Sequence, residues 1–226
     1  MTSQAEKSSG AGRAVEIPVA AVRLAGELTI PDGAVGIVLF AHGSGSSRHS
    51  PRNHFVARFL CDAGIGTLLF DLLNLDEEAV DARTAELRFD IGLLASRLGE
   101  ATRWLRRQAD AGDLPFGYFG ASTGGAAALV AAAVLGDEVK AVVSRGGRPD
   151  LAGDALAAVR AATLLLVGGW DEPVIRMNQE AYAKLFCTKA LTIVPGATHL
   201  FEEPGTLEAV AQHAATWFRR HLSRQA

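Results

Sequence analysis

The sequence has few cysteines, no long apolar run and no excess of basic residues. Its two cysteines, Cys61 and Cys187, lie far apart and match no disulfide framework, zinc motif or redox motif. We therefore expect two buried free thiols, as in a reducing cytoplasm, and no metal site. No apolar run reaches the roughly 20 residues that a membrane-spanning helix needs. The chain has 22 Lys and Arg against 25 Asp and Glu, a net charge of −3 that argues against nucleic acids and membrane surfaces as partners.

The first 14 residues also lack an apolar segment. They are polar and rich in Ser, Gly and Ala, which is not the pattern of a signal peptide or a membrane anchor. This composition predicts a disordered tail over residues 1–14. Residues 15–226 hold enough apolar side chains to bury a sizeable core. We expect them to form a single cytoplasmic domain without a separate cap domain.

The apolar residues of that domain follow two different periods. Residues 15–19 and 22–30 alternate apolar with polar residues, which predicts an antiparallel hairpin with one solvated face. Later strands are predicted from short, continuously apolar runs at 36–41, 66–70, 116–119, 139–144, 163–167 and 191–194. Helices are predicted between them at 54–63, 86–109, 126–135, 154–160, 174–185 and 206–223. This alternation predicts an α/β fold, a mostly parallel twisted sheet with helices on both faces. The connection 71–85 has no strand, and we interpret it as a flap over the site.

Polar residues follow the predicted strands at the edge where parallel sheets bind ligands. The loops after the carboxyl ends of parallel strands share one edge of the sheet. Ser122 follows one predicted strand, Asp171 follows a later strand, and His199 follows the last strand. Nucleophile, acid and base occur in this same chain order in one large class of hydrolases. The sequence therefore predicts that these three side chains meet.

Ser122 lies at the centre of a Gly-x-Ser-x-Gly pattern, between Gly120 and Gly124. A predicted strand precedes it and a helix of small apolar residues follows it, as in a nucleophile elbow. The two glycines would let such a turn close without side-chain clashes. Ser122 would alternatively serve only as the N-cap of the helix. We favour the nucleophile, because an acid and a base accompany it.

His199 is the candidate general base, and Asp171 is the candidate acid that orients it. His199 would alternatively cap the final helix or pack on Phe201. A Glu-Pro pair follows Asp171, so this aspartate would alternatively only begin a helix. Asp150 is the alternative acid.

The backbone amides of Thr123 and Ser44 are the candidate oxyanion hole, which needs two N–H groups aimed at the developing charge. Thr123 directly follows the nucleophile, and Ser44 lies in the loop after the first parallel strand. The Gly- and Ser-rich residues 43–47 would alternatively hold a phosphate, but the Gly-Lys-Ser/Thr ending of a P-loop is missing. We expect His42, which precedes this loop, to brace it by hydrogen bonding.

Arginines are concentrated in two loops of the same edge, at Arg48, Arg52, Arg145 and Arg148. Guanidinium groups bind carboxylates in a bidentate manner, so Arg145 and Arg148 are candidates for binding an anionic substrate group. The arginines would equally be solvated charges or partners of nearby acids. Trp170 is a candidate wall of the acyl pocket, or alternatively a surface aromatic.

Together these residues resemble the α/β-hydrolases, and among them the small, lidless, dienelactone-hydrolase-like group. The resemblance extends over nearly everything after residue 14 and is most specific at residues 42–53, 120–125 and 144–150. It implies Ser122, Asp171 and His199 as the catalytic triad and requires no cofactor. Dienelactone hydrolases use a cysteine nucleophile where this sequence has serine, which favours ordinary carboxylic esters as substrates.

The sequence therefore predicts a serine hydrolase that cleaves small carboxylic esters or lactones through an acyl-enzyme. The expected partner is a small molecule, anionic if the arginines contact it, and the protein is expected to be a monomer or homodimer. Three alternatives stay open. The same triad would support acyl transfer or thioester cleavage, the scaffold would serve as a non-catalytic ligand-binding protein, or residues 43–47 would bind a phosphate ligand.

Overall fold

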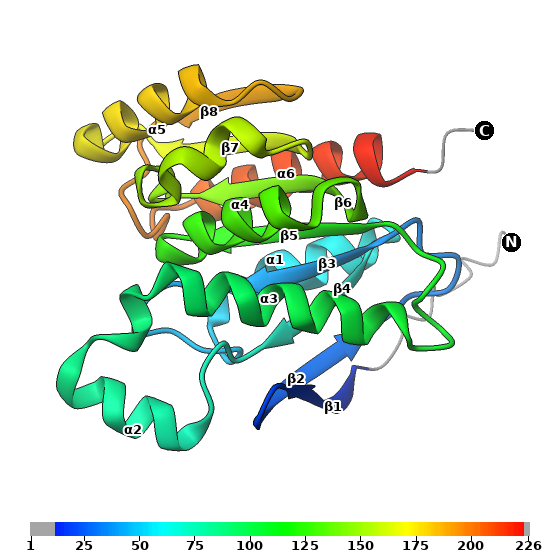
Figure 1. Ribbon diagram of the computed structural model, residues 1–226. Helices are drawn as coiled ribbons and strands as arrows, with labels where there is room; N and C mark the ends of the chain where they lie inside the picture. The colour runs from blue at the N-terminus through cyan, green and yellow to red at the C-terminus, as the bar shows by residue number, and fades with distance from the viewer. Residues whose placement is uncertain (1–11, 224–226) are drawn as a thin grey trace, which may run out of the picture.

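A computed structural model describes residues 12–223 of the chain (Figure 1). The predicted tail falls mostly on residues 1–11, which lie outside the described residues. Its last two positions, Arg13 and Ala14, belong to the first strand. The described chain therefore enters regular structure two residues earlier than the apolar pattern indicates.

Eight strands form one twisted sheet, which confirms the predicted α/β architecture. Their order across the sheet is β1-β2-β4-β3-β5-β6-β7-β8. The first two strands pair antiparallel and β2 pairs antiparallel with β4, whereas all later pairings are parallel. The strands are β1 Arg13–Val19, β2 Val22–Thr29, β3 Ile37–Ala41, β4 Gly66–Phe70, β5 Phe116–Ala121, β6 Val139–Arg145, β7 Ala162–Gly168 and β8 Lys189–Val194. The inner strands β3, β4, β5 and β7 are buried at every residue, as helices on both faces require.

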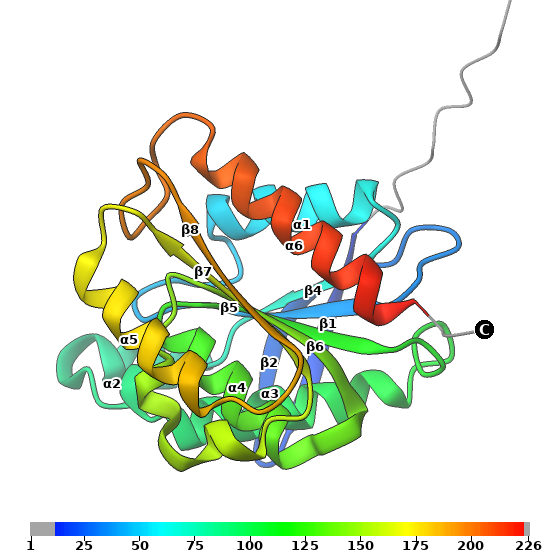
Figure 2. The same ribbon diagram turned by 90° about the horizontal axis from the view of Figure 1, so that it is seen from above.

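Helices cover the two faces of this sheet, as Figures 1 and 2 show. One face carries α1 (Pro51–Asp62) and α6 (Thr206–Leu222), which pack together over a core that includes Phe40, Phe119 and Phe218. The opposite face carries α3, α4 and α5 over a second core. These helices are α3 Ile91–Arg106, α4 Thr123–Leu135 and α5 Glu172–Lys184. Two 3-10 segments flank β6 in the chain, the short turn η2 Gly136–Glu138 before it and the irregular η3 Pro149–Ala158 after it.

Three stretches differ from the predicted elements. The helix expected at 154–160 is instead the end of the 3-10 segment η3, which is kinked at Gly153. The long helix expected at 86–109 is divided into a 3-10 turn, η1 (Leu87–Phe89), and α3, because Asp90 ends the first and caps the second through the Leu93 amide. The predicted flap contains a further helix, α2 (Leu75–Thr84), which lies away from the sheet at the lower left of Figure 1. A capping box at Asn74 and Glu77 begins this helix.

Both cysteines carry free thiols and are half-buried, rather than fully buried as expected. Burial raises the pKa of the Cys61 thiol above its usual value, although its hydrogen bond with Thr67 opposes this. Across residues 12–223, no helix combines the length and the apolar character needed to cross a membrane.

Candidate active site

Ser122 occupies a strained turn between β5 and α4. Its φ of 50° and ψ of −120° lie in a region that costs a non-glycine residue about 1–3 kcal/mol. Backbone hydrogen bonds hold this conformation: the Ser122 amide donates to the Arg145 carbonyl at 3.2 Å, and the Arg148 amide donates to the Ser122 carbonyl at 3.1 Å. The Ser122 side chain makes no capping hydrogen bond to α4. Ser122 therefore has the backbone of a nucleophile elbow rather than the side-chain role of a helix cap.

The two glycines of the motif are required by close packing within the turn. A Cβ at Gly120 would lie 2.5 Å from the Gly124 carbonyl oxygen. A Cβ at Gly124 would overlap the Ala41 carbonyl oxygen at the end of β3. Neither site has room for a side chain, so glycine is needed at both positions for the elbow to close against the sheet.

Asp171 and His199 are hydrogen-bonded to each other. The distance from His199 Nδ1 to Asp171 Oδ2 is 2.6 Å. Asp171 is the N-cap residue of α5, but its carboxylate accepts no hydrogen bond from that helix. An ionised carboxylate only accepts, so Nδ1 is the nitrogen that donates, and in a neutral imidazole with this tautomer Nε2 is the acceptor. The alternative acid, Asp150, instead binds Arg148 through two hydrogen bonds of 2.9 and 2.7 Å.

Ser122 and His199 contact two consecutive residues at the end of β6, Arg145 and Gly146 respectively. The Ser122 amide is bonded to the carbonyl of Arg145. Gly146 lies directly against the histidine, since a Cβ there would be 3.5 Å from His199 Cε1. The side chains of the three predicted triad residues thus come from the ends of β5, β7 and β8 and lie at one edge of the sheet.

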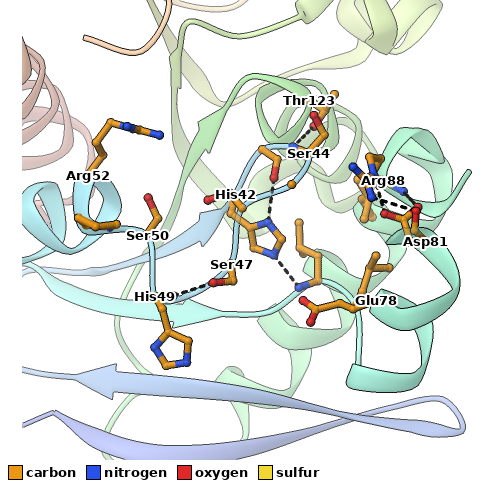
Figure 3. Close-up of a pocket in the computed structure, with 17 residues that line it drawn as sticks. His42, Ser44, Ser47, His49, Ser50, Arg52, Glu78, Asp81, Arg88 and Thr123 are labelled. Carbon is orange, nitrogen blue, oxygen red and sulfur yellow. Dashed lines mark hydrogen bonds and ion pairs between the residues drawn. The ribbon is translucent and has the colours of Figure 1, made fainter. Parts of the chain in front are cut away.

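The two candidate oxyanion amides differ in their surroundings. Thr123 is the first residue of α4, so its amide has no acceptor within the helix. The Ser44 amide instead donates to the Thr123 hydroxyl oxygen at 3.0 Å, the dashed contact at the top of Figure 3. Of the two amides expected to be free, only that of Thr123 lacks an acceptor among the described residues. The Ser44 amide already donates its hydrogen to the Thr123 hydroxyl.

A cavity of about 570 Å³ opens beside these residues. Its walls come from the loop after β3, from Leu72 and Leu73, from the α2–η1 segment and from Thr123. Gly43, in the cavity wall, approaches Ser122 so closely that a Cβ there would lie 3.1 Å from Ser122 Cβ. The segment predicted to be a flap thus supplies one side of a cavity next to the elbow.

His42 braces the cavity loop, as predicted. Its Nδ1 is 3.1 Å from the Gly43 carbonyl, and its Nε2 accepts from the Leu72 amide at 3.0 Å. Burial lowers the pKa of His42, which favours this neutral form. The loop amides are largely occupied: Ser44 binds Thr123, Ser46 binds the Gly43 carbonyl and Arg48 binds Asp71. This arrangement does not support the alternative of a phosphate cradle.

The arginines divide into neutralised and unneutralised groups. Arg48 is paired with Asp71 and Arg148 with Asp150, so the charge of Arg148, a predicted substrate ligand, is matched by a carboxylate of the chain itself. Arg52 is paired with the exposed Glu202 at 2.9 Å.

Arg145 is the exception among these cations. It is only 7% exposed, and within residues 12–223 it has no ion-pair partner. Its guanidinium lies 5.7 Å from the centre of the Phe201 ring and donates to the Leu200 carbonyl at 3.4 Å. Burial, together with the charge of Arg52, lowers the pKa of Arg145 to about 10. Arg145 is therefore a buried cation without a counter-charge, next to the histidine loop.

Trp170 does not lie in the cavity wall. The residue is 69% exposed, which fits the surface alternative, and it shares its absence from the cavity lining with Arg145 and His199. Residues 12–223 contain no cluster of three or more His, Cys, Asp or Glu side chains arranged to hold a metal ion.

Comparison with known proteins places this geometry in context, although no protein-family profile matches the chain. A crystal structure of dienelactone hydrolase from Anabaena variabilis is 61% identical, covers 95% of this chain and 99% of its own, and superposes with a TM-score of 0.93. An esterase from Pyrococcus furiosus (17% identity, TM-score 0.78, 95% of this chain and 94% of its own) shares the fold. So does a dienelactone-hydrolase-like promiscuous phosphotriesterase from metagenomic libraries (19% identity, TM-score 0.73, 95% of this chain and 100% of its own).

Two curated proteins of Mycobacterium tuberculosis are also similar, each 59% identical over 208 residues. Both are provisionally named phosphoribosyl transferases. The match covers 92% of this chain but only 46% of either relative, so the chain spans about half the length of the curated proteins it matches.

Proposed function

Because the chain belongs to the dienelactone-hydrolase-like family of α/β-hydrolases, and is thus a hydrolase, we propose that it is a serine esterase for small carboxylic esters or lactones. The observation that carries this proposal is the hydrogen bond between Asp171 and His199, at the sheet edge where Ser122 occupies the strained elbow. If Ser122 only capped a helix and His199 only packed against its neighbours, neither the strained backbone nor the bond to Asp171 would be needed.

In the proposed reaction, Nε2 of His199 removes the proton from Ser122 Oγ as that oxygen attacks the substrate carbonyl. Asp171 holds the imidazole in the tautomer with Nδ1 protonated and stabilises the imidazolium that forms. The tetrahedral oxyanion lies at the N-terminus of α4, where the partial positive charge of the helix favours it. His199 then gives its proton to the leaving alcohol, and it later activates the water that cleaves the acyl-enzyme.

The test is turnover of p-nitrophenyl esters of graded acyl length, with lactones alongside. Ser122→Ala should lower kcat by about 10,000-fold or more, because only binding and oxyanion effects remain. Ser96→Ala, on the exposed side of α3, is the matched control and should behave as wild type. Near-normal ester hydrolysis by Ser122→Ala would disprove the mechanism.

We extend the proposal to a preference for substrates that carry an anionic group, on the basis of Arg145. Arg145 does not line the cavity beside Thr123, so such a group would approach its guanidinium from the side of the His199 loop. A buried guanidinium without a counter-charge gains a strong charge-assisted hydrogen bond when a carboxylate arrives. Arg145→Met should therefore raise KM for a carboxylate-bearing ester by about 10-fold or more while leaving a neutral ester of equal size nearly unchanged. Arg148→Met, whose guanidinium is already neutralised by Asp150, is the control. Equal effects of Arg145→Met on both esters would contradict the preference.

Acyl transfer and thioester cleavage remain compatible with the same three residues. Product analysis in the presence of alcohol or thiol acceptors separates them from hydrolysis. The phosphoribosyl transferase name belongs to proteins about twice as long as the matched region, and no observation on this chain favours that activity.

A further inference from the structure

The hydroxyl of Thr123 is held beside the Ser122 turn by a backbone amide. Thr123 is only 3% exposed, lies directly after the nucleophile and forms part of the cavity wall. Its oxygen accepts from the Ser44 amide at 3.0 Å. Figure 3 shows this contact joining the loop after β3 to the start of α4. The amide expected to stabilise the oxyanion thus reaches only the Thr123 oxygen.

The proton of this hydroxyl is not committed to any other group. A hydroxyl has one donor hydrogen in addition to its acceptor sites. Other threonines in helices use that hydrogen on backbone carbonyls, as Thr102 does with Leu98 at 2.8 Å and Thr216 with Gln212 at 2.9 Å. For Thr123 the described residues provide only the incoming hydrogen bond from Ser44. Its hydrogen is therefore free to point into the cavity.

We propose that Thr123 is a catalytic residue whose hydroxyl, positioned by the Ser44 amide, donates the second hydrogen bond to the oxyanion. This inference rests on the proposed esterase function and extends it. As Ser122 Oγ bonds to the carbonyl carbon, the carbonyl π electrons move onto the oxygen. That oxygen then accepts hydrogen bonds from the amide and the hydroxyl of Thr123.

No proton is transferred to the oxyanion in this step, and the charge returns to the carbonyl when the alcohol leaves. The bond from Ser44 N–H to the hydroxyl polarises the O–H group, so the two hydrogen bonds in series strengthen each other. Thr123 lies on a helix and Ser44 on an exposed loop. The donor that touches the substrate is therefore the one on the more rigid element.

The same contact has a competing interpretation. The Thr123 hydroxyl would simply occupy the oxyanion position in the empty enzyme and rotate away when substrate binds, which would free the Ser44 amide. The two interpretations predict opposite effects of removing the hydroxyl. If it donates, its removal slows the reaction, and if it only occupies the position, its removal leaves the rate unchanged or increases it.

The experiment measures kcat and KM for p-nitrophenyl acetate in Thr123→Val, Thr123→Ser and Thr123→Ala. Valine keeps the shape of threonine without the hydroxyl, and we expect its kcat to fall about 100- to 1,000-fold with KM changed less than about threefold. Thr123→Ser should restore kcat to within about tenfold of wild type. Affinity for a trifluoromethyl ketone, which forms a tetrahedral adduct, should fall in parallel with kcat/KM.

Thr216→Val, at an exposed threonine of α6 whose hydroxyl donates only to the Gln212 carbonyl, controls for loss of a hydroxyl in itself. If circular dichroism shows that Thr123→Val does not fold, Thr123→Ala replaces it, because alanine favours helix and also lacks the hydroxyl. The same fall in kcat is expected. A kcat within threefold of wild type in the folded variant without the hydroxyl would overturn the inference. Ser122→Ala separates the two proposals: if it is inactive while Thr123→Val is active, only the role of Thr123 is wrong.

Discussion

Replacing Asp171 by asparagine removes one negative charge while keeping the shape of the side chain. The carboxylate is 14% exposed and the imidazole is 38% exposed, with 2.6 Å between Oδ2 and Nδ1. Unit charges about 4 Å apart interact by about 4 kcal/mol near a protein surface and by about 1 kcal/mol in water. The imidazole is more than one-third exposed, so the lost charge–charge attraction lies toward the lower end of that range, at about 1–2 kcal/mol. This corresponds to a rate about 5- to 30-fold slower.

The tautomer adds a second effect to the loss of charge. Asparagine presents an N–H₂ group as readily as an oxygen, and a facing N–H₂ would stabilise the wrong tautomer of His199. In serine proteases this exchange costs about 10,000-fold. We therefore expect kcat of Asp171→Asn for p-nitrophenyl acetate to fall by between about 100- and 10,000-fold, with little change in KM.

The control is Asp150→Asn, which breaks only the pair with Arg148. Its kcat should stay within about threefold of wild type, because the Arg148–Asp150 pair is partly exposed and does not contact His199. Stopped-flow or steady-state release of p-nitrophenolate measures both variants. An active Asp171→Asn together with an inactive Asp150→Asn would refute the assignment of the acid.

Two further predictions concern stability. Burial lowers the pKa of His42, so below about pH 6.5 the unfolded chain takes up a proton that the folded chain refuses, and stability falls as the pH falls. Thermal melts from about pH 7 to pH 5 should therefore show a larger loss of Tm in wild type than in His42→Asn. An equal loss of Tm in both proteins would contradict the interpretation that neutral His42 holds the loop. Gly120→Ala places a Cβ 2.5 Å from the Gly124 carbonyl oxygen and should destabilise the fold by about 1–3 kcal/mol. Gly99→Ala, inside α3, places a Cβ 4.0 Å from Leu135 Cδ1 of α4 and should be neutral or stabilising in the same urea titration. Equal unfolding midpoints for the two glycine variants would show that the elbow tolerates a side chain.

The sheet could be predicted from the sequence because its strands carry a strong local signal. Continuous apolar runs bounded by Gly and Pro identified the six parallel strands to within one or two residues. The weaker helices lacked such a signal. In α2 the only buried residue is Asp81, so the segment shows no apolar face from which a helix could be recognised. The spacing of Asn74 and Glu77 was the available indication of its start.

The site could be predicted at the level of strand ends but not at the level of side-chain partners. Chain order and the parallel topology are enough to bring the loops of Ser122, Asp171 and His199 to one edge. Which arginine keeps an uncompensated charge depends on contacts such as Arg48 with Asp71, which join segments distant in sequence. The bond between Ser44 and Thr123 likewise depends on how closely the loop after β3 approaches α4.

The central claim is that His199 activates the hydroxyl of Ser122, and covalent labelling tests it most directly. A fluorophosphonate reacts with a serine that a neighbouring base has activated, and peptide mass spectrometry locates the modified residue. We expect modification at Ser122 in the folded wild-type protein and labelling slower by orders of magnitude in His199→Ala. Labelling at another residue, or equally fast labelling of Ser122 without the histidine, would contradict the account.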